Sequence, residues 1–431
     1  MQIRTSLGDR RPRRGAIAIL AVLALAGSVR AQTALTWEQI VAKFKASNPT
    51  LHAAQLNIDE SRDAEITAYL RPNPEFSLTA DGFQVARNQS VWRPLSGVEE
   101  SPGISYLHER QHKRELRLEG AKISTSIAAS TYEDQERNLL FNLRNAFVQL
   151  LQAKAVMENA RQNLNYWDNE LRVNRTRFQA GDLAQVDLSR LELQRVQFES
   201  DFENAIVNLR TAKIQLLMLL DQRTPIEQFD VAGPYDYADH LRPMEEYRNL
   251  AAENRPDLRA AAQQVDLAVS THKLAIANGS TDPTFSVWFT HNPSFSNPYA
   301  NETVGGSISI PLRIFDRNQG EKARTQVDIR RNERLRDAAQ AQVFNDVDSA
   351  YVTLVSALNL LRPYKTKYLP LATDVRDRVA FSYRNGAASL LDYLDAEKSY
   401  RDTRLAYLNL IASYLTAAAQ MNLAVGREVM E

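Results

Sequence analysis

The sequence of 431 residues contains no cysteine. This absence excludes disulfides, thiolate metal sites, a cysteine nucleophile and a lipid-anchored N-terminal cysteine. An excess of charge of either sign is also absent, since 52 Lys and Arg residues balance 52 Asp and Glu residues. The mean charge therefore predicts neither a nucleic acid nor an anionic surface as a partner.

Long apolar runs are missing beyond residue 31, where no stretch approaches the roughly 18 apolar residues of a membrane-spanning helix. The N-terminus has four arginines within residues 10–14, then an apolar run over 16–26 and a small-x-small ending at Ala31. This arrangement is typical of a cleaved secretory signal. We therefore expect a signal peptide over residues 1–31, with cleavage after Ala31.

The rest of the chain contains an internal repeat. Residues 177–192 and 382–397 share an aromatic residue, a glycine three positions later, then an aspartate and a glutamate at matching distances. Two further pairs of segments match in the same order: 48–51 with 255–258, and 74–78 with 283–287. We interpret the chain as a tandem duplication, with repeat 1 over 32–222, a connector over 223–254 and repeat 2 over 255–431.

Each repeat is expected to contain a helix, two strands, a very long helix, a turn and a second long helix. Apolar residues after each glycine step alternately by three and four, which is typical of coiled-coil packing. They are Leu188, Leu191, Phe198, Phe202, Ala205, Leu209, Ala212, Leu216 and Leu219 in one copy, with Arg195 at one position of the pattern, and Tyr393, Ala396, Tyr400, Tyr407, Leu410, Tyr414, Ala417, Met421 and Ala424 in the other, with Thr403 at one position. A second seam through Leu391, Leu394, Leu405, Leu408, Ala412 and Leu415 predicts packing on two neighbours, as in a closed wall of helices. An ordinary bundle core is the alternative.

The helices before the two turns are expected to be longer still. Residues 109–179 contain no proline, and about 70 helical residues would reach ~105 Å. The matching segment, 319–382, is expected to kink at Pro363 and Pro370.

Four short segments alternate apolar and polar residues and are expected to be strands. Their apolar positions are Phe76, Leu78 and Ala80; Ile104 and Tyr106; Phe285, Val287 and Phe289; and Val304, Gly306, Ile308 and Ile310. Strands of about ten residues suit a tilted membrane strand, but open edges are not tolerated in lipid, so several protomers would have to share one barrel. The loops are expected over 86–102 and 292–303. A soluble hairpin packed on the helices is the alternative.

Residues 108–112, His-Glu-Arg-Gln-His, match the zinc-protease pattern H-E-x-x-H. In that pattern two histidines at helical spacing bind zinc and the glutamate acts as a base. A catalytic zinc needs a third protein ligand, and no further histidine follows at the spacing of the extended motif. Glu133, a candidate carboxylate, lies on the same expected helix, ~30 Å away by its rise per residue. A periplasmic zinc metallopeptidase therefore stands as the alternative from another class.

The signal peptide, the duplicated strand–helix architecture and the aromatic-x-x-Gly…Asp turn together resemble the TolC-like outer-membrane efflux family. The most specific part is Tyr383-x-x-Gly386 followed by Asp392 and Asp395. The resemblance implies a mainly α fold with a small β part. Long coiled-coil helices would form a periplasmic α-barrel, and four strands would contribute to a trimeric 12-stranded membrane β-barrel. Residues 109–117 also resemble a Glu-Arg-Gly-Gly-Lys-Arg segment of the cation-efflux (CzcC-like) branch, although Gln111-His112 replaces its two glycines.

The same resemblance implies a place for the two turns. Gly181, Gly386 and the aromatic Phe178 would lie at the periplasmic tips, where the hairpins of an adaptor protein dock. A basic gate residue of some family members falls at Ala388, so that lock is expected to be absent.

A pore gate is implied at the second turn. Asp392 and Asp395 would form rings at the pore constriction, and Tyr383 would tie the coils shut through an aspartate matched by Asp187. Two aspartates three residues apart lie on one helix face. Threefold symmetry would gather six carboxylates, which would attract cations. For Asp392 a plain helix-start role is the alternative.

These observations predict a passive outer-membrane exit duct of a tripartite efflux pump that reaches into the periplasm. It is not expected to be an enzyme or to need a cofactor or metal. The expected partners are two further copies of the chain, a periplasmic adaptor, an inner-membrane transporter of the RND type and outer-membrane lipid. The expected cargo is metal cations or small toxic compounds. The exit duct of a type I protein secretion system is the alternative.

Overall fold

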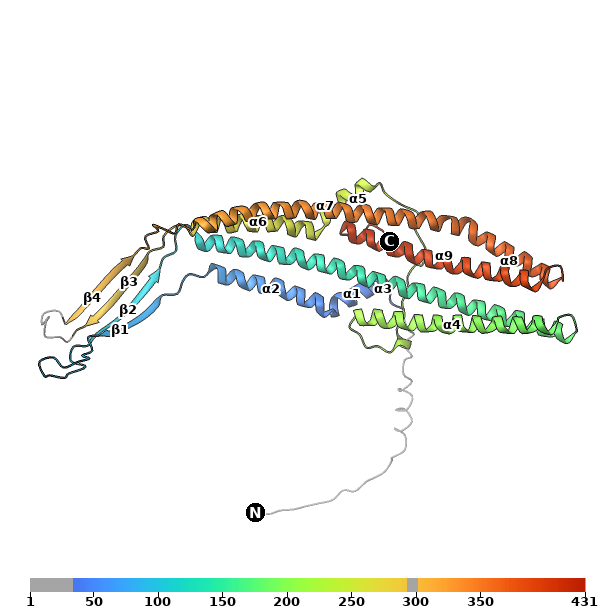
Figure 1. Cartoon of the computed structure of the whole chain (residues 1–431), viewed down its shortest axis with the longest axis horizontal. Helices are drawn as coiled ribbons and strands as arrows, with labels where there is room; N and C mark the ends of the chain where they lie inside the picture. The colour runs from blue at the N-terminus through green and yellow to red at the C-terminus, as the bar shows by residue number, and fades with distance from the viewer. Residues whose placement is uncertain (1–33, 293–300, 431) are drawn as a thin grey trace, which may run out of the picture.

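The computed structural model describes residues 34–292 and 301–430. The expected signal peptide over 1–31 and most of the loop over 292–303 lie outside the described residues. The molecule is elongated, with a small sheet at one end and long helices running side by side toward the other (Figure 1). In the described part of the chain, no helix has the length and apolar character needed to cross a membrane.

The four expected strands are present and form one antiparallel sheet in the order β1-β2-β3-β4. Their bounds are β1 (Glu75–Asp81), β2 (Glu99–Leu107), β3 (Thr284–His291) and β4 (Glu302–Ser309). The strand β2 begins a few residues earlier than expected, because Glu99 already pairs with Asp81. The sheet brings the two strand pairs together, although nearly 180 residues of chain separate them.

The register of the sheet places the predicted apolar positions on one face. Phe76 pairs with Ile104, Ile104 with Val287, and Val287 with Gly306. Because side chains alternate between faces along a strand, the apolar residues share one surface and the serines and threonines share the other. The apolar face is uncovered in the single chain, with exposed fractions of 72% for Phe76 and 61% for Val287.

The helix expected before each strand pair is in fact two helices. Helices α1 (Trp37–Ser47) and α2 (Pro49–Tyr69) precede β1, and α5 (Met244–Asn254) and α6 (Pro256–Ala277) precede β3. The breaks fall at Asn48 and Arg255, each of which comes directly before a proline and has extended backbone angles. A proline disfavours helical geometry in the residue before it, so the matching Asn-Pro and Arg-Pro motifs end one helix and begin the next.

The expected long helices are present. Helix α3 (Lys113–Gln179) has 67 residues, which corresponds to ~100 Å. It is followed by α4 (Gln185–Leu219) and a short turn, η1 (Ile226–Gln228). The second half contains α7 (Gln319–Pro363), a π-helical turn η2 (Tyr364–Tyr368), α8 (Leu369–Arg384) and α9 (Leu390–Val425).

The second long helix departs from α geometry at the predicted prolines. The turn η2 lies between Pro363 and Pro370, and the Leu369 N–H donates to the carbonyl of Tyr364, five residues back. Because Pro370 has no N–H and its ring crowds the preceding turn, the wider π turn accommodates it without ending the helix.

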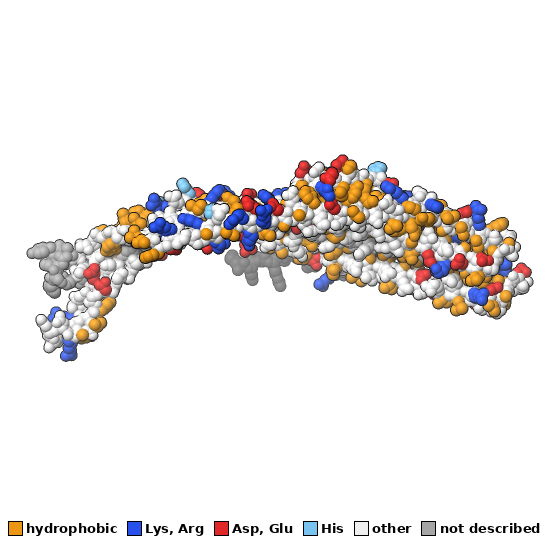
Figure 2. Space-filling model, turned by 45° about the horizontal axis from the view of Figure 1, so that its top comes forward, with side chains coloured by type: hydrophobic (Ala, Val, Ile, Leu, Met, Phe, Trp, Pro, Cys, Tyr) orange, Lys and Arg blue, Asp and Glu red, His pale blue; other side chains and the backbone are white. Residues whose placement is uncertain are grey.

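The predicted coiled-coil seams form the core. Six of the ten seam positions of α4 and seven of the ten of α9 are buried, and the others are partly buried. Helix α4 packs on α3, α3 on α9, and α9 on α7 and α8, while α2, α3, α6 and α7 are neighbours nearer the sheet. The second α9 seam is only partly covered in the single chain, because Ala412 and Leu415 are buried whereas Leu391 remains 71% exposed. Figure 2 shows many further hydrophobic side chains on the surface of the helices.

Candidate functional site: the helical tip

Two tight turns form the end of the molecule opposite the sheet (Figure 1). Gly181 lies between α3 and α4, and Gly386 between α8 and α9. Both have positive φ angles, +87° and +75°. In each turn the residue after the glycine donates its N–H to the carbonyl five positions earlier, at 2.8 Å. This is the bond pattern of a Schellman helix end, so the two turns share one backbone geometry.

Asp392 and Asp395 lie in the first turns of α9, directly after the Gly386 turn. The Asp392 carboxylate accepts hydrogen bonds from the backbone N–H of Ser389 at 3.1 Å and from its hydroxyl at 2.7 Å. The Ser389 Oγ in turn accepts from the N–H of Asp392, which completes a capping box. These bonds to Ser389 lower the pKa of Asp392. Both aspartates are exposed, so Asp392 stabilises the helix start and also presents an ionised group at the tip.

A stack of aromatic rings joins the two coils just behind the turns. The rings of Tyr383 on α8 and Tyr393 on α9 are 5.0 Å apart between centroids and parallel within 2°. Tyr393 also stacks on Trp167 of α3, at 6.1 Å. The Trp167 indole N–H donates to the carbonyl of Leu191 on α4 at 3.0 Å. The α3–α4 coil and the α8–α9 coil are thus held together by buried rings at the tip.

The hydroxyl of Tyr383 has a different partner from the one expected. It donates to Oδ1 of Asn174 at 3.1 Å, whereas the Asp187 carboxylate lies 3.8 Å from Arg190. The expected bond from Tyr383 to Asp187 is therefore replaced. Asn174 is buried on α3, at 1% exposure, within reach of the Tyr383 hydroxyl. Asp187 lies in the first turn of α4 and is partly exposed. The tie still joins α8 to the α3–α4 coil, but through a neutral amide.

Phe178, expected at the docking tip, is partly buried against the aromatic cluster that holds Tyr383 and Tyr393. Gly181 and Gly386, by contrast, are exposed. Of the tip residues predicted from sequence, the two glycines and the two aspartates of α9 are available to a partner, and Phe178 mainly supports the turn.

Two buried carboxylates behind the stack were not anticipated from sequence. Glu170 on α3 is 6% exposed and forms an ion pair with Arg384 of α8. Glu397 on α9 is 8% exposed, and its Oε1 has no hydrogen-bond partner in the described part of the chain. Burial raises the pKa of Glu397, against the opposing influence of Tyr166 and Arg376. One sequence signal was available, since Glu397 follows the seam residue Tyr393 by one helical turn.

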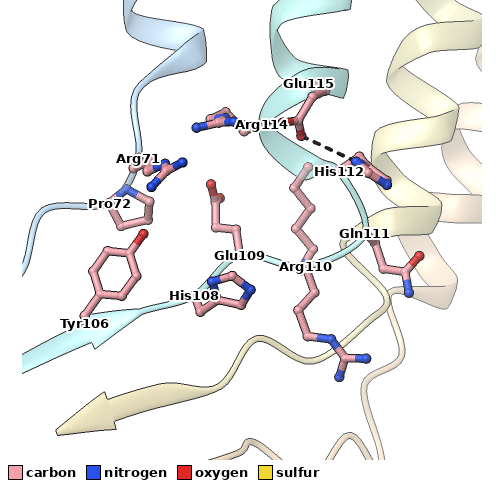
Figure 3. A pocket seen from close by; sticks show the side chains of 11 residues that line it. Arg71, Pro72, Tyr106, His108, Glu109, Arg110, Gln111, His112, Arg114 and Glu115 are labelled. Atoms are coloured by element: carbon pink, nitrogen blue, oxygen red, sulfur yellow. Dashed lines mark hydrogen bonds and ion pairs between the residues drawn. The ribbon is translucent and has the colours of Figure 1, made fainter.

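The histidine motif lies at the other end of the helices. Residues 108–112 line a pocket of about 430 Å³ where β2 passes into α3 (Figure 3). Helix α3 begins only at Lys113, and Gln111 and His112 have φ angles of +57° and +54°. The two histidines therefore do not have the helical spacing that the zinc motif requires.

The glutamate of this motif is also already engaged. The Glu109 carboxylate accepts two hydrogen bonds from the Arg117 guanidinium, the longer at 2.8 Å. Residues 34–292 and 301–430 contain no group of three His, Asp or Glu side chains placed to hold a metal ion. The zinc metallopeptidase alternative is wrong for this chain, because a strand–helix junction separates the histidines that one helix would have had to align.

Comparison with known proteins identifies the family. The model of the family described as "Outer membrane efflux protein" matches residues 40–222 and 247–427. The chain is 23% identical to the cobalt-zinc-cadmium resistance protein CzcC of Cupriavidus metallidurans, covering 91% of this chain and 90% of that protein. It is 22% identical to the outer membrane protein TolC of Salmonella enteritidis, covering 95% and 85%.

Solved structures show the same fold. CusC superimposes with a TM-score of 0.73 at 16% identity, covering 91% of this chain and 92% of CusC. VceC of Vibrio cholerae gives a TM-score of 0.73 at 15% identity, covering 91% and 96%. Outer membrane factors of this family form trimers and act in tripartite pumps with adaptor proteins and inner-membrane transporters. The chain belongs to the outer membrane efflux protein family, and it is an outer-membrane efflux duct that extends into the periplasm, not an enzyme.

Proposed function

We propose that three copies of this chain form one duct, with the sheet end in the outer membrane and the helical tips in the periplasm. The main support for this placement is that one face of the sheet is apolar and exposed, whereas the other face holds most of its serines and threonines. Four strands per chain and three chains would close a 12-stranded barrel with the apolar face toward lipid. The 67-residue helix α3 supplies the length needed to reach far into the periplasm.

Helix α4 has an exposed apolar stripe that suits side-by-side contact between copies of the chain. On α4, Val186, Leu193, Val207 and Ile214 lie at multiples of seven residues and are 52–71% exposed. This heptad stripe faces away from the buried seam of the same helix, so it has no partner within one chain. Since strict heptads favour helix–helix packing, a neighbouring copy is the partner that fits.

We assign adaptor docking to the two tips and the pore gate to the second of them. The exposed Gly181 and Gly386 turns share one geometry, which suits repeated hairpins of an adaptor. Asp392 and Asp395 supply exposed carboxylates beside the Gly386 turn, and the Tyr383 stack holds the coils together behind it. The duplication into repeats over 32–222 and 255–431 accounts for the two tips, and it is supported by the two segments, 40–222 and 247–427, that match the family model.

For the cargo, we propose metal cations, exported with an inner-membrane transporter of the RND type. The support is the similarity over 91% of the chain to a protein named for cobalt, zinc and cadmium resistance. A relative at 24% identity is named for pyoverdine export, so small organic compounds are the second candidate. Deleting the gene in its host should lower tolerance to divalent cobalt, zinc or cadmium. Lost tolerance to organic compounds alone would select the second candidate, and lost secretion of a protein would select a type I secretion duct.

The assembly is tested by membrane fractionation followed by native mass measurement of the detergent-extracted protein. A trimer in the outer-membrane fraction is expected. A monomer released without detergent would contradict the proposed placement.

The gate assignment is tested separately in single-channel recordings. Asp392→Ala combined with Asp395→Ala should weaken block of the current by divalent cations, because the carboxylates that attract them are removed. Asp374→Ala combined with Asp377→Ala, on the preceding helix, is the control with equal loss of charge. Unchanged block in the Asp392/Asp395 variant would remove the gate assignment and leave the fold unaffected.

A further inference from the structure

The pocket around the histidine motif lies at the foot of the apolar face of the sheet. Its lining includes Tyr106, which pairs with Phe285 and so belongs to the apolar face. In Figure 3 the Tyr106 ring points toward Pro72, and Arg71 and Glu109 lie beside them. Leu70, which directly precedes Arg71, is 60% exposed. The pocket therefore begins where the apolar surface ends.

The acidic side chains that line this junction pocket are already neutralised. Glu109 is bound by Arg117, and Glu115 by Arg114 at 2.9 Å. Another cation of the lining, Lys113, is paired at 2.5 Å with Asp282. The pocket thus has no carboxylate free to bind a cationic ligand.

Two exposed arginines of the pocket are unpaired. Neither Arg71 nor Arg110 has a side-chain ion-pair or hydrogen-bond partner in the described part of the chain, and His108 and His112 are exposed beside them. In addition, the Nε of Arg114 is buried without a hydrogen-bond acceptor. The pocket therefore has an excess of positive charge and unused donors, which is the complement of an anion.

The start of α3 adds to this positive character. His112 occupies the position before the first turn in a left-handed conformation, and no side chain caps the helix there. The free N–H groups of a helix start carry partial positive charge and favour a phosphate. They support the arginines here and do not define the site by themselves.

We propose that the junction pocket binds the phosphate of an anionic phospholipid headgroup, with the acyl chains lying along the apolar face above Tyr106. The proposal rests on the membrane placement given under the proposed function. Arg71, which lies beside Tyr106 and Pro72, is the group that contacts the phosphate, and Arg110, whose side chain points to the other side of the loop (Figure 3), adds unpaired positive charge to the junction. A zwitterionic headgroup fits less well, because its ammonium group would find both pocket carboxylates occupied. Tyrosine is favoured at this depth, where its ring can face lipid and its hydroxyl water.

The test is native mass spectrometry of the detergent-extracted protein, incubated with equimolar phosphatidylglycerol and phosphatidylcholine of the same acyl chains. The wild type should retain phosphatidylglycerol preferentially. Arg71→Ala combined with Arg110→Ala should reduce that retention by roughly 25-fold, because each arginine near a lipid phosphate contributes about fivefold. The control, Arg331→Ala combined with Arg334→Ala, removes two exposed arginines of α7, and it should retain lipid like the wild type.

A second measurement separates a lipid from a free phosphate. Millimolar inorganic phosphate should not displace the lipid, since the apolar face also holds the chains; displacement would show a simple phosphate site and overturn the lipid assignment. Equal retention of the two lipids by the wild type, or unchanged retention in the Arg71/Arg110 variant, would also overturn it. If these results came from a trimer in the outer-membrane fraction, the proposed duct would stand. A monomer released without detergent would overturn the duct and the lipid site together.

Discussion

Gly181 and Gly386 are required at the tips by backbone conformation and not by space. Their φ angles are positive, and a Cβ added at either position would meet no atom within 4 Å. Any other residue in the left-handed region costs roughly 1–2 kcal/mol. The sequence match around these two positions therefore reflects one turn geometry used twice.

Gly386→Ala should lower the free energy of unfolding by roughly 1 kcal/mol, because alanine is strained at a φ of +75°. Chemical denaturation of the extracted protein measures the change. Gly320→Ala is the matched control, since Gly320 lies in α7 with open space around its Cβ position. That change should stabilise by up to about 1 kcal/mol. Equal effects of the two substitutions would contradict the conformational explanation.

The buried carboxyl of Glu397 makes the stability of the tip region depend on pH. Burial raises its pKa in the folded chain, so ionisation of this carboxyl opposes folding. The cost of this ionisation to the free energy of unfolding is absent below the pKa that Glu397 has in the unfolded chain. It grows as the pH rises from there through the raised pKa of Glu397 in the folded chain. Tyr166 and Arg376 act against this rise in the pKa, the Glu170 and Asp377 carboxylates add to it, and one Glu397 oxygen has no hydrogen-bond partner in the described residues.

Glu397→Gln should therefore stabilise the protein at pH 8 by about 1 kcal/mol, since an unsatisfied buried charge is removed. At pH 4 the gain should disappear, because the glutamate is then protonated in both states. Thermal unfolding at the two pH values measures the difference. Glu203→Gln, on an exposed position of α4, should show no such dependence. A gain that was equal at both pH values would rule out ionisation as its cause.

At the scale of elements, the packing of the sheet around Trp288 requires glycine at two positions, Gly103 and Gly305. The ring of Trp288 covers Gly305 on β4, and its Cβ lies 3.0 Å from the position that a Cβ of Gly103 would take. Trp288 is a large apolar residue on the mainly polar face, and it can lie flat only because its cross-strand neighbours, Gly103 and Gly305, have no side chains. Glycine in these strands thus makes room for a ring, as expected for a close approach within a sheet.

Gly305→Ala should destabilise the sheet by roughly 1–3 kcal/mol, because the added methyl group would overlap the Trp288 ring. The adjacent Gly306→Ala is the control, since its Cβ would lie 3.6 Å from the nearest atom, the Ser286 carbonyl oxygen. Chemical unfolding followed by circular dichroism measures the free energy of unfolding of both variants. If Gly306→Ala proved the more harmful of the two, the packing of the indole would not be the cause.

At the scale of the molecule, the two ends have different chemistry. One end has an uncovered apolar sheet face that stops at an arginine-lined pocket, and the other has glycine turns with exposed aspartates. Helix α3 spans the distance between them and contacts both α4 and α9 near the tip and both α2 and α6 near the sheet. It is the element through which the proposed membrane end and the proposed docking end are connected.

Ile214→Asp should dissociate the trimer, because it places a charge in the proposed contact between copies, where an unpaired buried charge is expensive. The residue is 52% exposed in the single chain, so the fold of the chain should be unaffected. Gln215→Asp changes the neighbouring exposed position, about 100° around the helix, and should leave the trimer intact. Native mass and circular dichroism together measure assembly and fold. A trimer that survives Ile214→Asp would exclude this stripe from the interface.

The sequence alone determined the elements whose signals are local or periodic. Alternation every second residue defined the four strands, heptad spacing defined the seams of α4 and α9, and paired glycine motifs defined the tips. The breaks in the first helices differ from the single helix expected in each repeat, because Pro49 and Pro256 force extended angles on Asn48 and Arg255 within an otherwise continuous helical pattern.

Only the tertiary structure decided which side chains meet across helices. Asn174, and not Asp187, binds Tyr383, because the packing of α3 against α8 sets which polar atom lies within reach. Glu170 and Glu397 are buried for the same reason; Glu397 lies one helical turn after the seam residue Tyr393, but no such pattern marks Glu170. The histidine motif was matched by spacing alone. Its conformation depends on the place where β2 leaves the sheet and α3 begins, and at this junction the two histidines lie in a loop, not on one helix face.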